Sequence, residues 1–288
     1  MSDDLFEKIV RDKNPPIKRD GITGLALPIE SRESLEKISE AYSPVYRLAS
    51  RETITSSRTE VKYIVSSPQL KFFSRGDAYP KEDIEFGGRE FDLTKKIGAI
   101  SVFGEELFFD SGILKMSRTL PELFSPQLGV AIEAACISGN GVIEPHGFIH
   151  DCNKIPATGT SGIVAYEDIE AIFKTLKAEY LPNAAWLLNQ DCFVNLAGMS
   201  KNGIQLMTPN NIGDSDGFMF GKPVFITALP AENPITFGDL SHYKILEREP
   251  VIDKLSEIYA QNGFIGFRLT KYMDAMLLHP DAIIALEI

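Results

Sequence analysis

The residues best suited to chemistry lie in one short stretch, His146, His150, Asp151 and Cys152. Two histidines four positions apart on a helix can share a metal ion, and a thiol can act as a ligand or a nucleophile. Pro145 and Gly147 disfavour a helix at this point, and no His-Glu-x-x-His pattern surrounds the pair. We therefore interpret the stretch as a polar loop and assign it no metal.

The sequence carries none of the other catalytic patterns. Gly139-Asn140-Gly141 comes nearest to a nucleotide-binding loop, but Glu144 stands where the dinucleotide fingerprint needs glycine. Neither a Gly-Lys-Ser/Thr phosphate loop nor a Gly-x-Ser-x-Gly elbow occurs. Glu105 and Glu106 are adjacent, so on a strand they would point to opposite faces. We predict no catalytic residue, no cofactor and no enzyme activity.

Composition excludes further classes of protein. The 288 residues are 44% hydrophobic and 24% charged, as in ordinary soluble proteins, and no apolar run approaches the roughly 20 residues of a membrane span. Three widely spaced cysteines, Cys136, Cys152 and Cys192, are typical of reduced thiols in a protein made in the cytoplasm. The N-terminus is acidic and polar, which does not predict a secretory signal. The net charge of −11 argues against tight binding of nucleic acid.

In the first half of the chain, few of the predicted helices and strands would be stable on their own. A short helix is expected from Ser31, with Leu35 and Ile38 at helical spacing. Residues 52–103 alternate as strands around a polar stretch, 74–83, which predicts a long two-stranded β-arm. Because an isolated hairpin is marginal in water, we expect a neighbouring subunit to cover this arm. A helix should follow, capped by Thr119 and ending at Ser138.

From residue 163 the chain alternates helices and strands, so the predicted class is mixed α+β. Apolar spacing predicts a helix around 169–180, a buried strand at 184–188, and a helix that Asn189 caps. Residues 199–217 read as a loop rich in glycine and asparagine. The C-terminal part predicts strands at 223–227, 243–246 and 264–272, a turn at 273–276, and a closing strand at 282–287.

Several motifs in this order resemble the major capsid proteins of tailed bacteriophages, which have the Hong Kong 97 fold. They are FDLTKKIGA at 91–99, SVFGEEL at 101–107, ISGNG at 137–141, EPHGF at 144–148, LPNAAWLLN at 181–189, FGKPV at 220–224, FGD at 237–239, GFIGFR at 263–268 and HPDAI at 279–283. The similarity covers about 84–288, and residues 1–55 match only loosely.

The resemblance implies an architecture and a set of partners. It implies an N-terminal arm with a short helix (1–55), an extended β-loop (56–100), a peripheral domain with a long spine helix (101–150), an axial domain (151–262) and closing strands that return to both (263–288). The subunit would form pentamers and hexamers of an icosahedral virion shell around double-stranded DNA, made in the host cytoplasm and away from membranes. Portal and scaffolding proteins, and in some relatives a decoration protein, would be further partners.

The same resemblance places contacts between subunits on the extended loop and on the axial loop. The candidate residues are Lys71, Arg75, Lys81, Glu82, Asp83, Asn202, Asn210 and Asn211. Two alternatives remain open. One is an encapsulin-like nanocompartment shell, which shares the fold and differs in its contents. The other is a small cytoplasmic metal- or thiol-dependent hydrolase that would use the stretch from His146 to Cys152.

Overall fold

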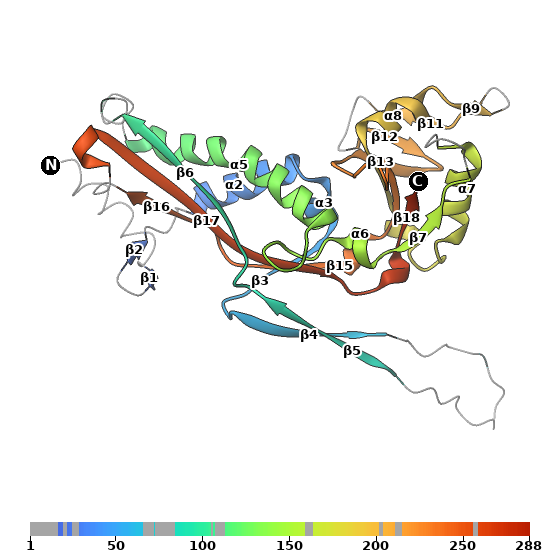
Figure 1. Ribbon diagram of the computed structural model, residues 1–288, viewed down its shortest axis with the longest axis horizontal. Coiled ribbons are helices and arrows are strands. Elements are labelled where there is room, and N and C mark those ends of the chain that lie inside the picture. The colour runs from blue at the N-terminus through green and yellow to red at the C-terminus, as the bar shows by residue number, and fades with distance from the viewer. Residues whose placement is uncertain are drawn as a thin grey trace.

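The computed structural model describes residues 17–19, 22–24, 29–65, 72, 84–104, 106, 113–158, 164–201, 204–210, 215–255 and 259–288. Figure 1 shows two bodies joined side by side, with a thin arm that projects away from both. One body is elongated and contains a long helix against a long strand. The other is compact and contains the C-terminal strand. Each body has its own cluster of buried apolar residues.

The helical layer of the elongated body consists of three helices, α2 (Ile29–Ala41), α3 (Pro44–Leu48) and α5 (Ile113–Ser138). Helix α2 confirms the helix expected from Ser31. It packs closely against α5 at Gly129, where a Cβ atom would stand 2.7 Å from the carbonyl oxygen of Ser39. Any larger residue at position 129 would therefore push the two helices apart.

The long helix α5 begins earlier than the sequence predicts. Thr119 is not its cap, because the helix starts at Ile113 and carries Pro121 and Pro126 inside it. An internal proline costs a backbone hydrogen bond. Burial of Leu120 and Phe124, both 5% exposed, offsets that cost.

A long sheet lies under these helices, and one strand organises it. Its strands are β3 (Ser50–Thr53), β6 (Lys96–Gly104), β15 (Tyr243–Glu247), β16 (Val251–Leu255) and β17 (Phe264–Leu277). Strand β17 pairs antiparallel with β6 and β16 along its first part and with β15 along its last part. Strand β3 joins β15 in parallel. The turn predicted at 273–276 is wrong, because β17 continues through it with Met273, Ala275 and Leu277 buried.

The compact body is built on a seven-stranded sheet, in the order β11-β12-β13-β8-β14-β18-β7. Its strands are β7 (Asn153–Pro156), β8 (Ala185–Leu188), β11 (Met207–Pro209), β12 (Gly217–Met219), β13 (Lys222–Ile226), β14 (Ile235–Gly238) and β18 (Ile283–Glu287). Helices α7 (Tyr166–Thr175) and α8 (Gln190–Ala197) pack on it. The Asn189 side chain caps α8 as predicted, by accepting a hydrogen bond from the Cys192 N–H.

Trp186 occupies the centre of the compact body. Its ring stacks on Phe237 with 4.1 Å between ring centroids, and its indole N–H donates to the carbonyl of Met219 at 3.1 Å. Both polar and apolar parts of the indole are thereby satisfied in the core. Other short elements are β1 (Ile17–Arg19), β2 (Ile22–Gly24), α6 (Phe148–Asp151), β9 (Ser200–Lys201) and β10 (Ile204–Gln205).

The arm is a two-stranded antiparallel ribbon of β4 (Arg58–Ile64) and β5 (Phe86–Asp92), as the alternating pattern predicts. Its two faces differ. One face carries Thr59, Val61 and Tyr63, which are partly buried, and the opposite face is exposed along the ribbon. The segment 96–100, which the sequence places with the arm, lies in β6 and pairs with β17.

The carboxylate of Glu133 on α5 is buried beneath the start of α3. Its Oε2 accepts hydrogen bonds from the Ser43 hydroxyl at 2.5 Å and from the Val45 N–H at 3.2 Å. Its Oε1 is buried, and no other described residue hydrogen-bonds to it. Burial raises the pKa of Glu133 to about 7, although both hydrogen bonds act in the opposite direction.

Stability should therefore depend on the charge of Glu133. The folded chain holds a proton that an exposed glutamate, with a pKa of 4.5, releases earlier. The contribution of the protonated Glu133 carboxyl to the free energy of unfolding is fully present below about pH 4.5 and is lost as the pH rises through about 7. Because Glu133→Gln stays neutral, we expect it to be more stable than the parent by about 3 kcal/mol above pH 7 and equally stable near pH 4. Urea denaturation of both proteins across this range measures the difference; a gap that does not change with pH would contradict the assignment.

Candidate assembly surfaces

The His146–Cys152 stretch forms the connection between α5 and the compact body. His146 Nε2 lies 3.4 Å from a carboxylate oxygen of Asp151, and the rings of His146 and His150 stack with 5.6 Å between centroids. Nε2 of His150 is instead hydrogen-bonded to the carbonyl of Ser138 at 3.2 Å. Across the part of the chain that the structure describes, no three His, Cys, Asp or Glu side chains converge as metal ligands would.

This stretch has a structural task. The short helix α6 does form, immediately after Gly147, which corrects the plain loop expected from the sequence. A Cβ atom on Gly147 would stand 2.4 Å from the carbonyl oxygen of Ile137, so the chain can fold back on α5 only with glycine here. The His146 N–H donates to the carbonyl of Ala275, which ties the connection to β17.

All three cysteines are free and buried. Burial raises the pKa of the Cys152 and Cys192 thiols to about 12 and raises that of Cys136 further. The Cys152 thiol donates to the carbonyl of Ile149. A reactive cysteine needs access to solvent and a lowered pKa, so these thiols have the properties of core residues.

The base of the arm is held by the buried carboxylate of Asp274 on β17. One oxygen accepts from the Lys95 ammonium at 2.7 Å, and the other accepts from the backbone N–H of Asp92 at 2.8 Å. Asp274 is fully buried and the side chain of Lys95 is 9% exposed. Phe91 and Leu93 are also buried at this point, at 1% exposed each. The arm thus leaves the body from a fixed base.

A second buried charge lies three residues earlier on the same strand. The Lys271 ammonium is 2.9 Å from a carboxylate oxygen of Glu247 on β15 and donates to the Tyr46 hydroxyl of α3 at 2.8 Å. Burial by itself would lower the pKa of Lys271, but Glu247 and Tyr46 raise it above its ordinary value. This trio joins α3 to the long sheet.

The face of the arm that carries Tyr63 rests on the junction between the two bodies. The Tyr63 ring meets His279 edge-on at 5.2 Å, His279 meets His242 at 4.8 Å, and His242 meets Tyr180 at 5.0 Å. Burial and the neighbouring His242 lower the pKa of His279. The contact extends the support of the arm beyond its base.

Among the described residues, the opposite face and the outer end of the ribbon have no such support. Ile64, Val65, Ile84 and Phe86 are 49%, 50%, 46% and 69% exposed. Ile64 lies opposite Phe86 in the ribbon, so the exposed face ends in an apolar cross-strand pair. Phe72 is fully exposed as well. A cluster of this kind on a subunit surface indicates a contact with another molecule.

Of the eight contact residues predicted from the sequence, the structure describes one, Asn210. Those outside the described residues are Lys71, Arg75, Lys81, Glu82, Asp83, Asn202 and Asn211. Asn210 is described and follows β11; its N–H donates to the carbonyl of Asp216, and its amide donates to the Ser215 hydroxyl. Asn210 therefore shapes the connection between β11 and β12, and its contact with another subunit stays a prediction. The plain loop predicted at 199–217 is wrong in part, because the short strands β9, β10 and β11 lie within it.

Sequence reasoning missed the two buried charges that position the arm and the helix α3. Asp274 and Lys271 stand on a strand whose other residues are largely apolar, and that contrast is the signal that could have drawn attention to them. Their partners could not have been found in the same way, since Lys95 is 179 positions from Asp274.

The model of the phage capsid family matches residues 23–288. The chain belongs to the phage capsid family. The resemblance drawn from the sequence motifs is thereby confirmed, and the protein is a major capsid protein, a structural component of the particle shell and not an enzyme. No helix among the described residues of this capsid protein is long and apolar enough to span a membrane.

Solved structures show the same fold over most of the chain. One is described as the capsid of a native GTA particle computed with C5 symmetry; it is 18% identical, has a TM-score of 0.65, and the match covers 94% of this chain and 95% of that chain. The structure from Microbacterium phage Oxtober96 is 14% identical with a TM-score of 0.62, and the match covers 100% of this chain and 98% of that chain. The structure from Gordonia phage Cozz is 14% identical with a TM-score of 0.60, and the match covers 85% of this chain and 86% of that chain. No curated protein matches the sequence. The predicted mixed α+β fold of the Hong Kong 97 type is confirmed.

The buried carboxylate should be indispensable to the capsid protein. Asp274→Ala leaves the Lys95 ammonium and the Asp92 N–H without their partner, so we expect the unassembled subunit to lose about 3 kcal/mol of stability in urea denaturation. Arg58→Ala is the matched control, because the 3.9 Å contact of Arg58 with Asp92 is solvent-exposed and surface pairs contribute little. Equal effects of the two substitutions would contradict a special role for Asp274.

The thiols of the capsid protein should be inert while it is folded. We expect a thiol reagent near pH 8 to modify none of the three cysteines in the native subunit and all three after denaturation, because burial keeps them protonated. Spectrophotometric titration of released thiolate counts them. Rapid modification of Cys152 in the native protein would reopen the question of a thiol-dependent activity.

Proposed function

We propose that this capsid protein assembles with copies of itself into five- and six-membered rings that close an icosahedral shell around double-stranded DNA. The observation that carries the proposal is the arm. Its base is fixed by Asp274, whereas its far end exposes the pair Ile64 and Phe86 to solvent. An arm with a fixed base and exposed apolar side chains is suited to lie over a neighbouring subunit.

A contact between the arm of one copy and the surface of the next also predicts the symmetry of the assembly. In Figure 1 the arm points away from its own body, so its end and the surface that receives it belong to different copies. Contacts of this head-to-tail kind form rings when their rotation closes. The GTA capsid with the same fold was computed with C5 symmetry, which agrees with a five-membered ring for the present chain.

We assign the two bodies to the two domains that the resemblance implies. The elongated body, with α5 and β17, would be the peripheral domain, and the compact body would be the axial domain. The compact sheet uses strands between Asn153 and Gly238 together with β18, whereas β15 and β16, which the predicted range 151–262 assigns to the axial domain, lie in the long sheet. Strand β18 supports this division, because β17 pairs in the long sheet and β18 pairs with β7 and β14 in the other. The segment 199–217 would then lie near the ring axes, with Asn202, Asn210 and Asn211 as contact residues.

Further partners follow from enclosing DNA. A portal through which DNA enters and a scaffolding protein that guides closure are the expected ones, and a decoration protein is an additional candidate. The net charge of −11 favours a wall that repels DNA and does not trap it during packaging.

Removing the end of the arm should separate folding from assembly. We expect a variant in which a short Gly-Ser linker replaces 71–83 to remain soluble, since the described contacts of the arm base lie outside this segment, but to form no closed shells. Electron microscopy of protein co-expressed with its scaffold measures closure, and a variant with a Gly-Ser segment of the original length is the control for loop length. Normal shells from the shortened variant would refute a role of the segment 71–83 in closure.

A further inference from the structure

The inner face of the arm is supported at two successive places. Nearest to the base, Val61 packs against the buried side chains of Phe91 and Leu93. Two residues further out, the Tyr63 ring meets His279 edge-on, with 5.2 Å between ring centroids. The first support is purely apolar, whereas the second contains a histidine, the side chain whose charge changes most readily near neutral pH. Only the second support should therefore respond to acid.

The place of the Tyr63 ring depends on a glycine in the other strand of the arm. Gly87 lies opposite Tyr63 in the ribbon, and a Cβ atom on Gly87 would stand 2.5 Å from the ring carbon that carries the hydroxyl. Any other residue at position 87 would therefore displace the ring. Gly88 faces the opposite, exposed side of the ribbon, where a Cβ atom would meet the carboxylate of Glu60.

Two histidines meet where the Tyr63 ring ends. The rings of His279 and His242 have centroids 4.8 Å apart, and His242 in turn contacts the Tyr180 ring at 5.0 Å. Nε2 of His242 lies 3.9 Å from a carboxylate oxygen of Asp239. Two imidazole rings at this distance repel each other once both carry a proton, so the cluster is compact only while at least one of them is neutral.

The charged groups around His279 do not favour its protonation. Asp281 is already paired with Lys177 at 2.5 Å, and Glu179 is exposed to solvent, which screens its charge. Burial and the neighbouring His242 lower the pKa of His279, although Glu179 and Asp281 act in the opposite direction. A movement of Tyr63 away from His279 would reduce that burial, so the histidine would bind a proton more readily.

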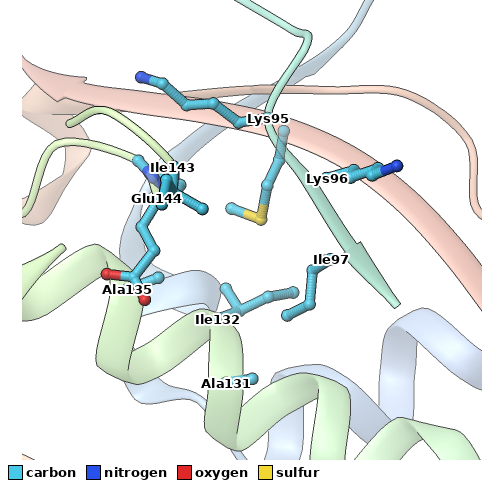
Figure 2. Close-up of a pocket in the computed structure, with 10 residues that line it drawn as sticks. Lys95, Lys96, Ile97, Ala131, Ile132, Ala135, Ile143 and Glu144 are labelled. Carbon is cyan, nitrogen blue, oxygen red and sulfur yellow. The ribbon is translucent and has the colours of Figure 1, made fainter. Parts of the chain in front are cut away.

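The base of the arm leaves room for such a movement. A hollow of about 290 Å³ lies where the base, the helix α5 and the loop after α5 meet, and Lys95 is among the residues that line it. Figure 2 shows Ile97 of β6 facing Ile143 and Glu144 across the hollow, with Ile132 of α5 beneath them. The connection from the arm to β6 thus borders open space on this side, and the arm can turn about its base without a clash there.

We propose that Tyr63, His279 and His242 form a proton-sensitive latch, which holds the arm against the junction of the two bodies at neutral pH and releases it in acid. The inference goes beyond the proposed assembly and does not require it, because the latch lies within one subunit. The buried pair of Asp274 and Lys95 would remain as the pivot of the released arm.

The direction of the pH dependence follows from the surroundings of His279. The latched state covers this ring and places His242 beside it, so the latched state binds fewer protons than the released state. The stability of the latched state relative to the released one is therefore fully present above about pH 6.5, the ordinary pKa of histidine. It is lost as the pH falls through the lowered pKa of His279.

Double electron–electron resonance on the unassembled subunit measures the position of the arm. Spin labels are attached at Phe86→Cys on the exposed end of the ribbon and at Lys174→Cys on the exposed side of α7. The native cysteines are buried and stay unlabelled. We expect the ratio of released to latched arms to rise about threefold between about pH 7.5 and about pH 5.5, because protonation of one histidine drives the change.

Three variants in the same doubly labelled subunit assign the effect to the latch. His279→Gln stays neutral, so we expect its ratio to change by less than about 1.5-fold over the same pH range. Gly87→Ala should release most arms at both pH values, because the added Cβ atom displaces the Tyr63 ring. Gly88→Ala is the matched control and should behave as the parent, since it meets only the exposed Glu60. Circular dichroism establishes that each variant folds.

Each outcome decides for or against the latch. A ratio that does not change with pH in the parent overturns it, and so does an equal rise in His279→Gln. Equal behaviour of Gly87→Ala and Gly88→Ala also overturns it, because the arm would then move independently of Tyr63. These measurements use single subunits, so their result is independent of shell formation. Subunits that form no shells with their scaffold would overturn the assembly proposal alone.

Discussion

Two charged side chains, Lys271 and Asp274, are buried three residues apart on β17, and each is neutralised by segments from elsewhere in the chain. Burying an unpaired charge costs several kcal/mol, on the order of 3–5 when one partner is removed. Lys271 therefore requires Glu247 and Tyr46, and Asp274 requires Lys95 and the backbone at Asp92. These requirements determine where α3 docks and where the arm leaves the body.

The strand that carries these charges also connects the rest of the fold. Strand β17 pairs with β6, β15 and β16, and the chain then passes through His279 into β18, the C-terminal strand of the compact body. The arm contacts this passage through Tyr63. A displacement of the arm would consequently change the packing at the junction of the two bodies. The rings that connect the two places are Tyr63, His279, His242 and Tyr180, each in contact with the next.

The interior of the subunit is well packed, but its surface leaves some apolar side chains exposed to solvent. Its buried clusters account for the stability of two bodies, yet the arm end and the hollow leave apolar groups in water. Burying one large apolar side chain contributes about 1.5–3 kcal/mol, so a contact made by a few such side chains is modest by itself. A closed ring multiplies that contact by the number of its members. In the proposed assembly, weak pairwise contacts and a stable shell are therefore compatible.

The sequence alone determined the class and most of the elements, because those depend on local patterns. Alternation identified β4 and β5, helical spacing and an Asn cap identified α8, and the order of the motifs identified the capsid family. The same local reasoning predicted that α5 begins at Thr119 and that β17 ends before residue 273, and both boundaries were wrong. It considered Thr119, Pro121 and the residues 273–276 without the residues that pack against them. Only the tertiary structure decided that β6 pairs with β17, that Asp274 holds the arm, and that α5, β6 and the loop after α5 enclose a hollow. The physical reason is distance along the chain: these contacts join residues up to 182 positions apart, and no window of sequence contains both partners.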